Sequence, residues 1–354
     1  MSERAKQKTY RGAAKRILEL QRDDGSIPWT EHGVFDAWNH AEGAMALWVM
    51  GEREAAARAR EHLRRTQNSD GSWWGVYGEA TAHEGGGMRP MGDRLRDTNH
   101  AAYVASLIAC EYLLTDDVAA VRRHWPMVEA AIDFALAHQT PEGDIRWAAK
   151  EARTPEEDAL LTGCSSIYKS LEAALRLASL LDVERPKWRE GRRALGQAIR
   201  DKPHRFDRQW PSNARFSMDW YYPVLAQAIV GDAAHERLKT RWADFVVEGF
   251  GCRCVDDAPW ATVAESCELA IALLVLGRRD DALRIFGEQA HARDETGAYW
   301  MGWQYERDVF WPAERASWTC AAVILAGDAL YGWTPAARLF TSSAREPIGR
   351  LPGV

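Results

Sequence analysis

Four carboxylate residues stand directly before or at the start of apolar segments that are long enough to form helices. They are Asp97, Asp219, Glu265 and Glu314. Hydrolysis of a glycosidic bond requires two carboxyl groups, one acting as the acid and the other as the base or nucleophile. If the four segments converge, the sequence predicts acid/base chemistry with Glu265 or Glu314 as the acid and Asp97 or Asp219 as the base.

Hydrogen-bonding and aromatic side chains accompany these carboxylates and form a candidate substrate-binding set. Its members are Trp38, Asn39, His40, Glu42, Asn99, His100, Tyr168, Trp220, Tyr221, Tyr222 and Trp318. Such a mixture suits a polyol, which needs hydrogen bonds and stacking surfaces, better than a carbocation, which needs a mostly aromatic cavity with one strong acid. An epimerase or lyase on the same scaffold would use His40 or His100 as its base.

Several of these residues also have a purely structural interpretation. Asp97 precedes Thr98 and Asn99 in an N-cap arrangement, and capping alone is worth about 1 kcal/mol. Asp219 opens its segment in the same way. His40 and Glu42 are two residues apart, so they cannot face the same side of a helix, and a core position is expected for His40.

The remaining two acid candidates have charged neighbours. Glu265 and Glu268 share a helix face, where two close carboxylates can raise one pKa or one of them can form a salt bridge. Glu314 adjoins Arg315, so an ion pair is the structural alternative for this residue.

The segments that carry these residues recur at intervals of roughly 45 to 65 residues, the size of a two-helix repeat with a long loop. Each begins with a polar or aromatic cluster and continues as a helix that is apolar on nearly all sides, which is typical of a buried helix. Six such helices in a ring would place their polar N-termini at one mouth. The opening clusters are residues 35–42, 97–100, 163–168, 218–222, 265–268 and 313–318.

A second set of amphipathic, more charged segments alternates with the first, and it predicts outer helices. They cover residues 11–20, 52–66, 117–138, 187–200, 235–248 and 280–290. Alternating inner and outer helices predict an all-α (α/α)6 barrel with little β-structure beyond short loop ribbons. We expect residues 1–337 to form one toroid domain and residues 338–354 to form a loosely ordered C-terminal tail.

A turn motif follows three of the outer segments. It begins at Gln21, Gln67 and Gln139 and continues through a Gly to a Trp, with a degenerate copy from Arg293 to Trp300. Asp-Gly and similar pairs supply a tight turn with positive φ. The Gln can bind the carbonyls that a helix end leaves free, so the motif predicts a helix stop.

These Q-x-x-D-G-S-x-W turns between alternating helices resemble the repeats of squalene–hopene cyclases and protein prenyltransferase β-subunits, over residues 11 to 337. The alternation also resembles the six-hairpin glycosidases. The chain lacks the D-x-D-D and D-D-x-x-D motifs of terpenoid chemistry and the Asp-x-Cys of the prenyltransferase zinc site. The resemblance therefore implies the toroid fold and leaves the activity to the residues at the mouth.

Composition narrows the range of partners. The net charge is −6 and no Lys/Arg block stands out, which argues against nucleic acid. No run of about 18 apolar residues predicts a membrane span, and six scattered cysteines indicate a reduced, cytoplasmic protein. No metal-ligand pattern or nucleotide-binding motif is present, so neither a metal nor a cofactor is expected.

Three hypotheses remain open. The first is a glycoside hydrolase-like enzyme that acts on a sugar. The second is a terpenoid cyclase or prenyltransferase relative with a non-standard acid, and the third is a toroid that binds a small molecule without catalysis. A Gly-rich loop at residues 83–96 is expected to act as a lid over the mouth.

Overall fold

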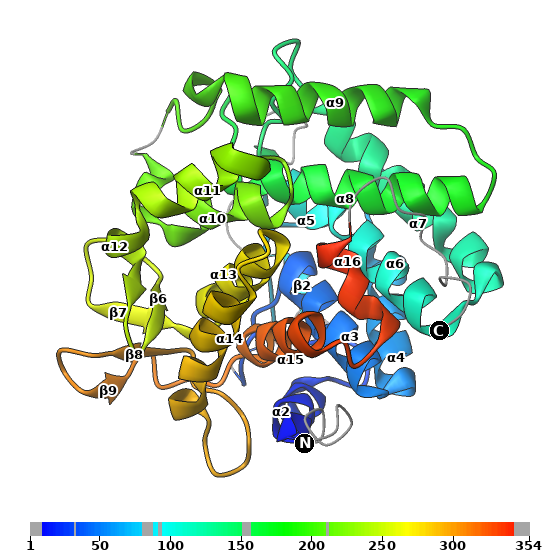
Figure 1. Ribbon diagram of the computed structural model, residues 1–354. Helices are drawn as coiled ribbons and strands as arrows, with labels where there is room; N and C mark the ends of the chain where they lie inside the picture. Colours follow the sequence, from blue (N-terminus) through cyan, green and yellow to red (C-terminus); the bar gives the residue numbers. More distant parts are fainter. Residues whose placement is uncertain are drawn as a thin grey trace.

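The computed structural model describes residues 9–31, 33–79, 88–90, 94–150, 157–209 and 212–342. Within these ranges, each predicted apolar segment forms a helix of an inner ring (Figure 1). Each inner helix packs against the next, and the last packs against the first, which closes the ring. The inner helices are α3 (Ala37–Met50), α5 (Thr98–Ala102) with α6 (Val104–Thr115), α8 (Leu161–Leu180), α10 (Ser217–Leu225), α13 (Val263–Val275) and α15 (Ser317–Tyr331).

The amphipathic segments form the outer layer, and each packs on the inner helix beside it. They are α2 (Arg11–Leu20), α4 (Arg53–Thr66), α7 (Val118–Ala137), α9 (Pro186–Asp201), α11 (Gly231–Thr240) and α14 (Arg279–Glu288). The (α/α)6 barrel predicted from the sequence is thereby confirmed. α2 packs on both α15 and α3, so the first outer helix seals the seam between the two ends of the ring.

The fifth outer helix is shorter than the expected segment 235–248. α11 ends at Thr240, and a single turn, α12 (Trp242–Phe245), leads into strand β5 (Val246–Val247). The two β-branched valines pair with strand β6 (Gly251–Arg253), a conformation that such residues favour over helix. The predicted helix therefore extended too far, because its last residues include a β-strand.

β-Structure is more extensive than the expected short ribbons. β5 and β6 belong to a five-stranded antiparallel sheet with β7 (Trp260–Thr262), β8 (Gly302–Gln304) and β9 (Val309–Phe310), in chain order. Two ribbons pair β1 (Tyr77–Glu79) with β2 (Met88–Pro90) and β3 (Arg96–Asp97) with β4 (Ala148–Ala149). β3 runs directly into α5 and β7 into α13, so these strands lie at the mouth formed by the helix N-termini. Of the expected lid, residues 83–87 and 91–93 lie outside the described part of the chain.

The Gln-Gly-Trp turns stop the outer helices as predicted. The Nε2 atoms of Gln21, Gln67 and Gln139 each donate one hydrogen bond to the glycine carbonyl of their own turn. Each also donates one to a backbone carbonyl of the following outer helix, at 2.9 Å in all three cases. The motif therefore fastens consecutive hairpins together as well as ending a helix.

At the opposite end of the barrel, the chain stays packed beyond the boundary expected at residue 337. The short helix α16 (Arg338–Thr341) buries Leu339 and Phe340, and it lies near the centre of the ring (Figure 1). Gln227 Nε2 holds this turn by donating to the Phe340 carbonyl at 2.9 Å. The tail assignment is thus corrected for residues 338–342, because two apolar side chains close the barrel floor. Residues 343–354 lie outside the described ranges.

Four 3-10 turns complete the described secondary structure: η2 (Pro203–Arg205), η3 (Asn213–Arg215), η4 (Gln289–Ala292) and η5 (Pro335–Ala337). The six cysteines are all free thiols, and five of them are buried. In the described part of the chain, none of the helices has both the length and the apolar character that a membrane crossing demands.

Candidate active site

The mouth of the barrel is built from the N-terminal ends of the inner helices. Asp36 is the N-cap of α3 and Asp97 the N-cap of α5, while Asp219 and Glu265 lie in the first turns of α10 and α13. Glu314 lies three residues before α15. The partial positive charge at each helix N-terminus stabilises these carboxylates, so the fold gathers acidic groups at one end.

Asp97 is a helix cap, as its sequence context suggested. Its Oδ1 accepts hydrogen bonds from the backbone N–H groups of Asn99 and His100 at 2.8 and 3.0 Å. Its Oδ2 lies 4.0 Å from His100 Nε2, which is also 3.9 Å from Asp36 Oδ1. The imidazole therefore lies between two carboxylates that both cap helices, and among the described residues its buried Nδ1 has no hydrogen-bond partner.

Asp219 has the properties of a proton donor. Its carboxyl is buried, and Oδ1 accepts a hydrogen bond from Thr162 Oγ1 at 2.8 Å. Burial, followed by the nearby charge of Asp207, raises the pKa of Asp219 to about 6. A carboxyl group with such a pKa keeps its proton in mildly acidic solution and can deliver it to a leaving oxygen.

Glu265 is the candidate carboxylate on the following inner helix. Its Oε2 is buried and has no hydrogen-bond partner in the described part of the chain. Burial, followed by the charge of Glu265, raises the pKa of the Cys254 thiol. Because α10 and α13 are neighbours in the ring, Asp219 and Glu265 lie at the starts of two adjacent inner helices.

Glu314 is in a different environment. The expected ion pair with Arg315 does not form, because Arg315 Nη1 binds Asp294 Oδ2 at 2.7 Å. The Arg315 guanidinium also lies over the Trp300 ring, at 4.8 Å from its centroid. Glu314 itself accepts a hydrogen bond from Met301 N through its backbone carbonyl. Its position before α15 keeps it at the mouth.

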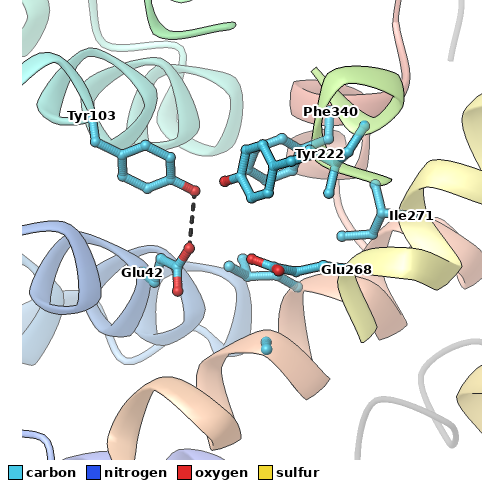
Figure 2. A pocket seen from close by; sticks show the side chains of 9 residues that line it. Glu42, Tyr103, Tyr222, Glu268, Ile271 and Phe340 are labelled. Carbon is cyan, nitrogen blue, oxygen red and sulfur yellow. Dashed lines mark hydrogen bonds between the residues drawn. The ribbon is translucent and has the colours of Figure 1, made fainter. Parts of the chain in front are cut away.

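Deeper in the barrel, two further carboxyl groups face a cavity of about 20 Å³, enough for about one water molecule (Figure 2). Glu42 accepts hydrogen bonds from Trp38 Nε1 at 3.0 Å and from the Tyr103 hydroxyl at 3.2 Å. Glu268 accepts one from Tyr221. Figure 2 shows the hydroxyls of Tyr103 and Tyr222 pointing towards each other above the two carboxyl groups.

Both of these carboxyl groups have raised pKa values. Burial, with the charge of Asp36 adding to it, raises the pKa of Glu42 to about 8. Burial and the charge of Glu42 raise the pKa of Glu268 well above its usual range. The pair lies between the mouth and the barrel floor, where Phe340 lines the same cavity.

Of the expected binding residues, Trp38, Asn39, Asn99 and His100 are placed at the mouth. The Trp38 ring lies 6.0 Å from the His100 ring and 5.8 Å from the Tyr103 ring, centroid to centroid. Asn39 Nδ2 donates to Asp36 Oδ2 at 2.7 Å. Trp318 is half-buried in the first turn of α15.

Three expected binding residues do not face the mouth. His40 is wholly buried; its Nδ1 accepts from Ile27 N and its Nε2 lies 2.8 Å from the Ala59 carbonyl, so neither nitrogen can act as a base. Tyr168 faces α9, where the Arg192 guanidinium lies 3.9 Å from its ring centroid. Trp220 is buried towards the outer layer and stacks on Phe245.

Tyr221 and Tyr222 are also buried, and they serve the central cavity. Tyr221 binds Glu268, while Tyr222 lines the cavity. Both tyrosines therefore lie beside Glu42 and Glu268, deeper in the barrel than the mouth.

The sequence analysis did not identify some of the residues that line or support the site. Tyr103, which binds Glu42, is a polar group beside an apolar inner helix, and that contrast was a usable signal. Thr162, which binds Asp219, stands in a helix with several other polar residues, so nothing in the sequence singled it out. Trp147 lines the mouth from a loop and carried no such signal. Among the described residues, no group of three or more His, Cys, Asp or Glu side chains could hold a metal ion.

Comparisons with known proteins bear on the family and the fold of the chain. No protein-family model matches the chain. The chain is 43% identical over 335 residues to the MMP endo-(1,4)-3-O-methyl-alpha-D-mannosidase of Mycolicibacterium hassiacum, covering 93% of this chain and 88% of that protein.

Solved structures with the same fold include a glycosidase variant in complex with glucose, with a TM-score of 0.70, 14% identity, and coverage of 93% of this chain and 98% of that one. A D-mannose isomerase gives a TM-score of 0.69 at 10% identity, covering 92% and 97% of the two chains. The cellobiose 2-epimerase of Spirochaeta thermophila gives 0.66 at 13% identity, covering 93% and 97%. At such identities these structures establish the toroid fold alone.

The turn motif resembles that of terpenoid cyclases, whereas the near full-length match is to a glycosidase. The chain belongs to the same family as the methylmannosidase of M. hassiacum, and it is a glycoside hydrolase of the six-hairpin α/α-toroid type.

Proposed function

We propose that this protein is an endo-acting mannosidase that cleaves α-(1,4) linkages in a 3-O-methylated mannose polysaccharide, with Asp219 as the general acid and Glu265 as the base or nucleophile. The observation that carries the proposal is the 43% identity to an enzyme of that description over nearly the whole of both chains. The acidic mouth, with two carboxyl groups on adjacent helices, supplies the chemistry that such cleavage needs.

The roles follow from the two environments. The raised pKa of Asp219, about 6, keeps a proton available for the leaving oxygen. The Thr162 hydroxyl fixes the orientation of its carboxyl group. Glu265, at a helix N-terminus that favours negative charge, would attack the sugar or activate a water. This reverses the base role that the sequence analysis allowed for Asp219.

The test is hydrolysis of α-(1,4)-linked 3-O-methylmannose oligosaccharides by the wild-type protein and by Asp219→Asn and Glu265→Gln. We expect kcat to fall by at least about 100-fold in each variant, since positioned acid/base groups contribute about 10²–10⁴. Thermal unfolding should stay near the wild-type temperature. Azide is expected to restore activity to Glu265→Gln, and the anomer that forms first, observed by NMR, reports inversion or retention.

Asp97→Ala and Glu314→Gln serve as matched comparisons. Asp97 caps a helix through Oδ1, so removing that oxygen should reduce stability more than kcat. Full activity in Asp219→Asn or Glu265→Gln would refute the assigned roles, and a large kcat loss confined to Glu314→Gln would transfer the acid role to that residue. Binding of the oligosaccharide without any cleavage would favour a non-catalytic toroid.

A further inference from the structure

A second cavity opens at the mouth, between the N-terminal ends of α3, α5 and α8. Its volume is about 110 Å³, several times the roughly 10–15 Å³ that one water molecule requires. Trp38, Ile145, Trp147, Leu160 and Ile167 give it a largely apolar wall. An apolar hollow of this size at the mouth of a sugar-cleaving enzyme calls for a ligand with an apolar group.

One polar group in this wall lacks a partner. Asn99 lines the cavity and is only 4% exposed. Its Oδ1 is buried without a hydrogen-bond partner among the described residues. A buried amide oxygen left in this state costs about 1–3 kcal/mol, and a ligand hydroxyl in the cavity would remove that cost.

The cavity adjoins the proposed general acid. Thr162, which donates to Asp219 Oδ1 at 2.8 Å, lines the cavity with its neighbour Gly163. A sugar unit seated here would therefore lie beside the bond that Asp219 protonates.

From these contacts, and resting on the proposed function, we infer that this cavity is the subsite that selects an O-methylated mannose unit. The methyl ether packs against the apolar wall, and a neighbouring free hydroxyl donates to Asn99 Oδ1. A hydrophobic pocket discriminates one added or missing methylene by about 10–200-fold. The subsite would therefore make the enzyme prefer methylated over unmethylated mannan.

Gly163 allows the cavity to be filled without disturbing the fold. A Cβ at this position would meet Asn99 Cβ at 3.8 Å and Leu160 Cβ at 3.9 Å, both ordinary contacts. Glycine in a helix is less favourable than alanine. Substitution should therefore preserve or raise the melting temperature while reducing the space for the methyl group. The matched control is Gly287→Ala in α14, where a Cβ meets nothing within 4 Å.

The experiment measures kcat/KM of wild type, Gly163→Ala, Gly163→Leu and Gly287→Ala on two α-(1,4)-mannose oligosaccharides, one 3-O-methylated and one unmethylated. We expect the wild type and Gly287→Ala to prefer the methylated substrate by about tenfold or more. Gly163→Ala should reduce that preference several-fold and Gly163→Leu should abolish it. Asn99→Ala should raise KM for both substrates and keep the preference.

An unchanged preference in both Gly163 variants, or an equal loss on both substrates, would overturn the inference while leaving the proposed function intact. If the wild type cleaves neither substrate, the proposed function fails. Calorimetric binding of methyl 3-O-methyl-α-mannoside then decides the subsite by itself. Binding that Gly163→Leu removes and Gly287→Ala retains would support it, and no binding to the wild type would refute it.

Discussion

At the residue scale, the unusual feature of this barrel is a pair of carboxyl groups in its centre. Glu42 and Glu268 come from different inner helices and line one small cavity. They are surrounded by the hydroxyls of Tyr103, Tyr221 and Tyr222, which donate to a carboxyl or lie beside it. Burial disfavours the charged form of both carboxyl groups, and the charge of Glu42 adds to this effect on Glu268, so the folded protein retains their protons to higher pH.

This retention makes the stability depend on pH. Burial raises the pKa of Glu42 from its ordinary value of 4.5 to about 8 in the folded protein, so the folded state binds a proton that the unfolded chain releases. The stabilisation that the folded protein gains by binding this proton is fully present below the pKa of Glu42 in the unfolded chain. It is lost as the pH rises through about 8, the pKa of Glu42 in the folded protein. Because Glu268 shifts in the same direction, the unfolding free energy should decrease steadily from about pH 5 to about pH 9.

The Glu42→Gln variant tests this pH dependence of the unfolding free energy, since glutamine keeps the shape of the side chain and an acceptor oxygen but does not titrate. We expect little change in unfolding free energy at about pH 5 and a gain of roughly 2–4 kcal/mol at about pH 8.5, at about 1.4 kcal/mol per unit of pKa shift. Urea unfolding at the two pH values measures it. Glu52→Gln, at an exposed residue, should show no such gain. Equal effects at both pH values would contradict the neutral pair.

The sequence predicted which residues lie at the helix starts better than it predicted where their side chains point. Asp97 was correctly placed as a cap, because the N-cap pattern is local in the chain. Tyr168 and Trp220 also lie near helix starts, yet they face the outer layer. His40 occupies the core position that was expected for it. The direction of a side chain depends on helix rotation, which helices that are apolar on all sides do not encode.

At the scale of elements, the short turns that end the outer helices also hold neighbouring helical hairpins together. Gly25, Gly71 and Gly143 have φ of +89°, +90° and +99°. A Cβ at each would approach a backbone carbonyl oxygen of the next outer helix within 2.1–2.5 Å. The glycine therefore serves two purposes, a left-handed turn and close contact between neighbouring hairpins.

Gly71→Ala should consequently be costly. Positive φ alone costs an L-residue about 1–2 kcal/mol, and the contact with Ala130 O at 2.1 Å adds about 1–3 kcal/mol as α7 is displaced. Gly51→Ala is the matched control, because Gly51 has φ of +84° and open space around it. Urea unfolding should separate the two variants by at least about 1 kcal/mol. Equal losses would mean that the helix contact contributes nothing.

The helices were predictable and the strands were not, for a physical reason. An amphipathic helix is recognised by three- and four-residue periodicity over about ten or more residues, which the outer set shows. The inner set is recognised by longer segments that are apolar on nearly all sides. The strands of the five-stranded sheet are two or three residues long, too short for alternation to be visible. The end of α11 at Thr240 was missed because the pairing of Val246 with Cys252 is a contact made in space.

At the scale of the whole molecule, the barrel differs from an open repeat protein because its ends meet. Ser317 Oγ donates to the Pro28 carbonyl at 2.7 Å, and Ser317 N donates to the Trp29 carbonyl at 2.8 Å. Arg16 Nε donates to the Arg315 carbonyl at 2.9 Å. These bonds join segments from opposite ends of the chain, and they lie beside the mouth. In an open stack the terminal repeats fray, whereas here each hairpin has two neighbours.

Ser317→Ala tests whether this seam limits local opening. The substitution removes the buried hydroxyl and leaves the Pro28 carbonyl without that donor, a loss of about 1–3 kcal/mol. Hydrogen exchange should accelerate in α2 and the first turns of α15, which flank the seam, while α8 and α9 on the far side of the ring keep wild-type rates. Faster exchange in all four helices would instead mean that the ring opens only by global unfolding. In that case the seam would be no weaker than any other helix contact, and the mouth would gain no local mobility from it.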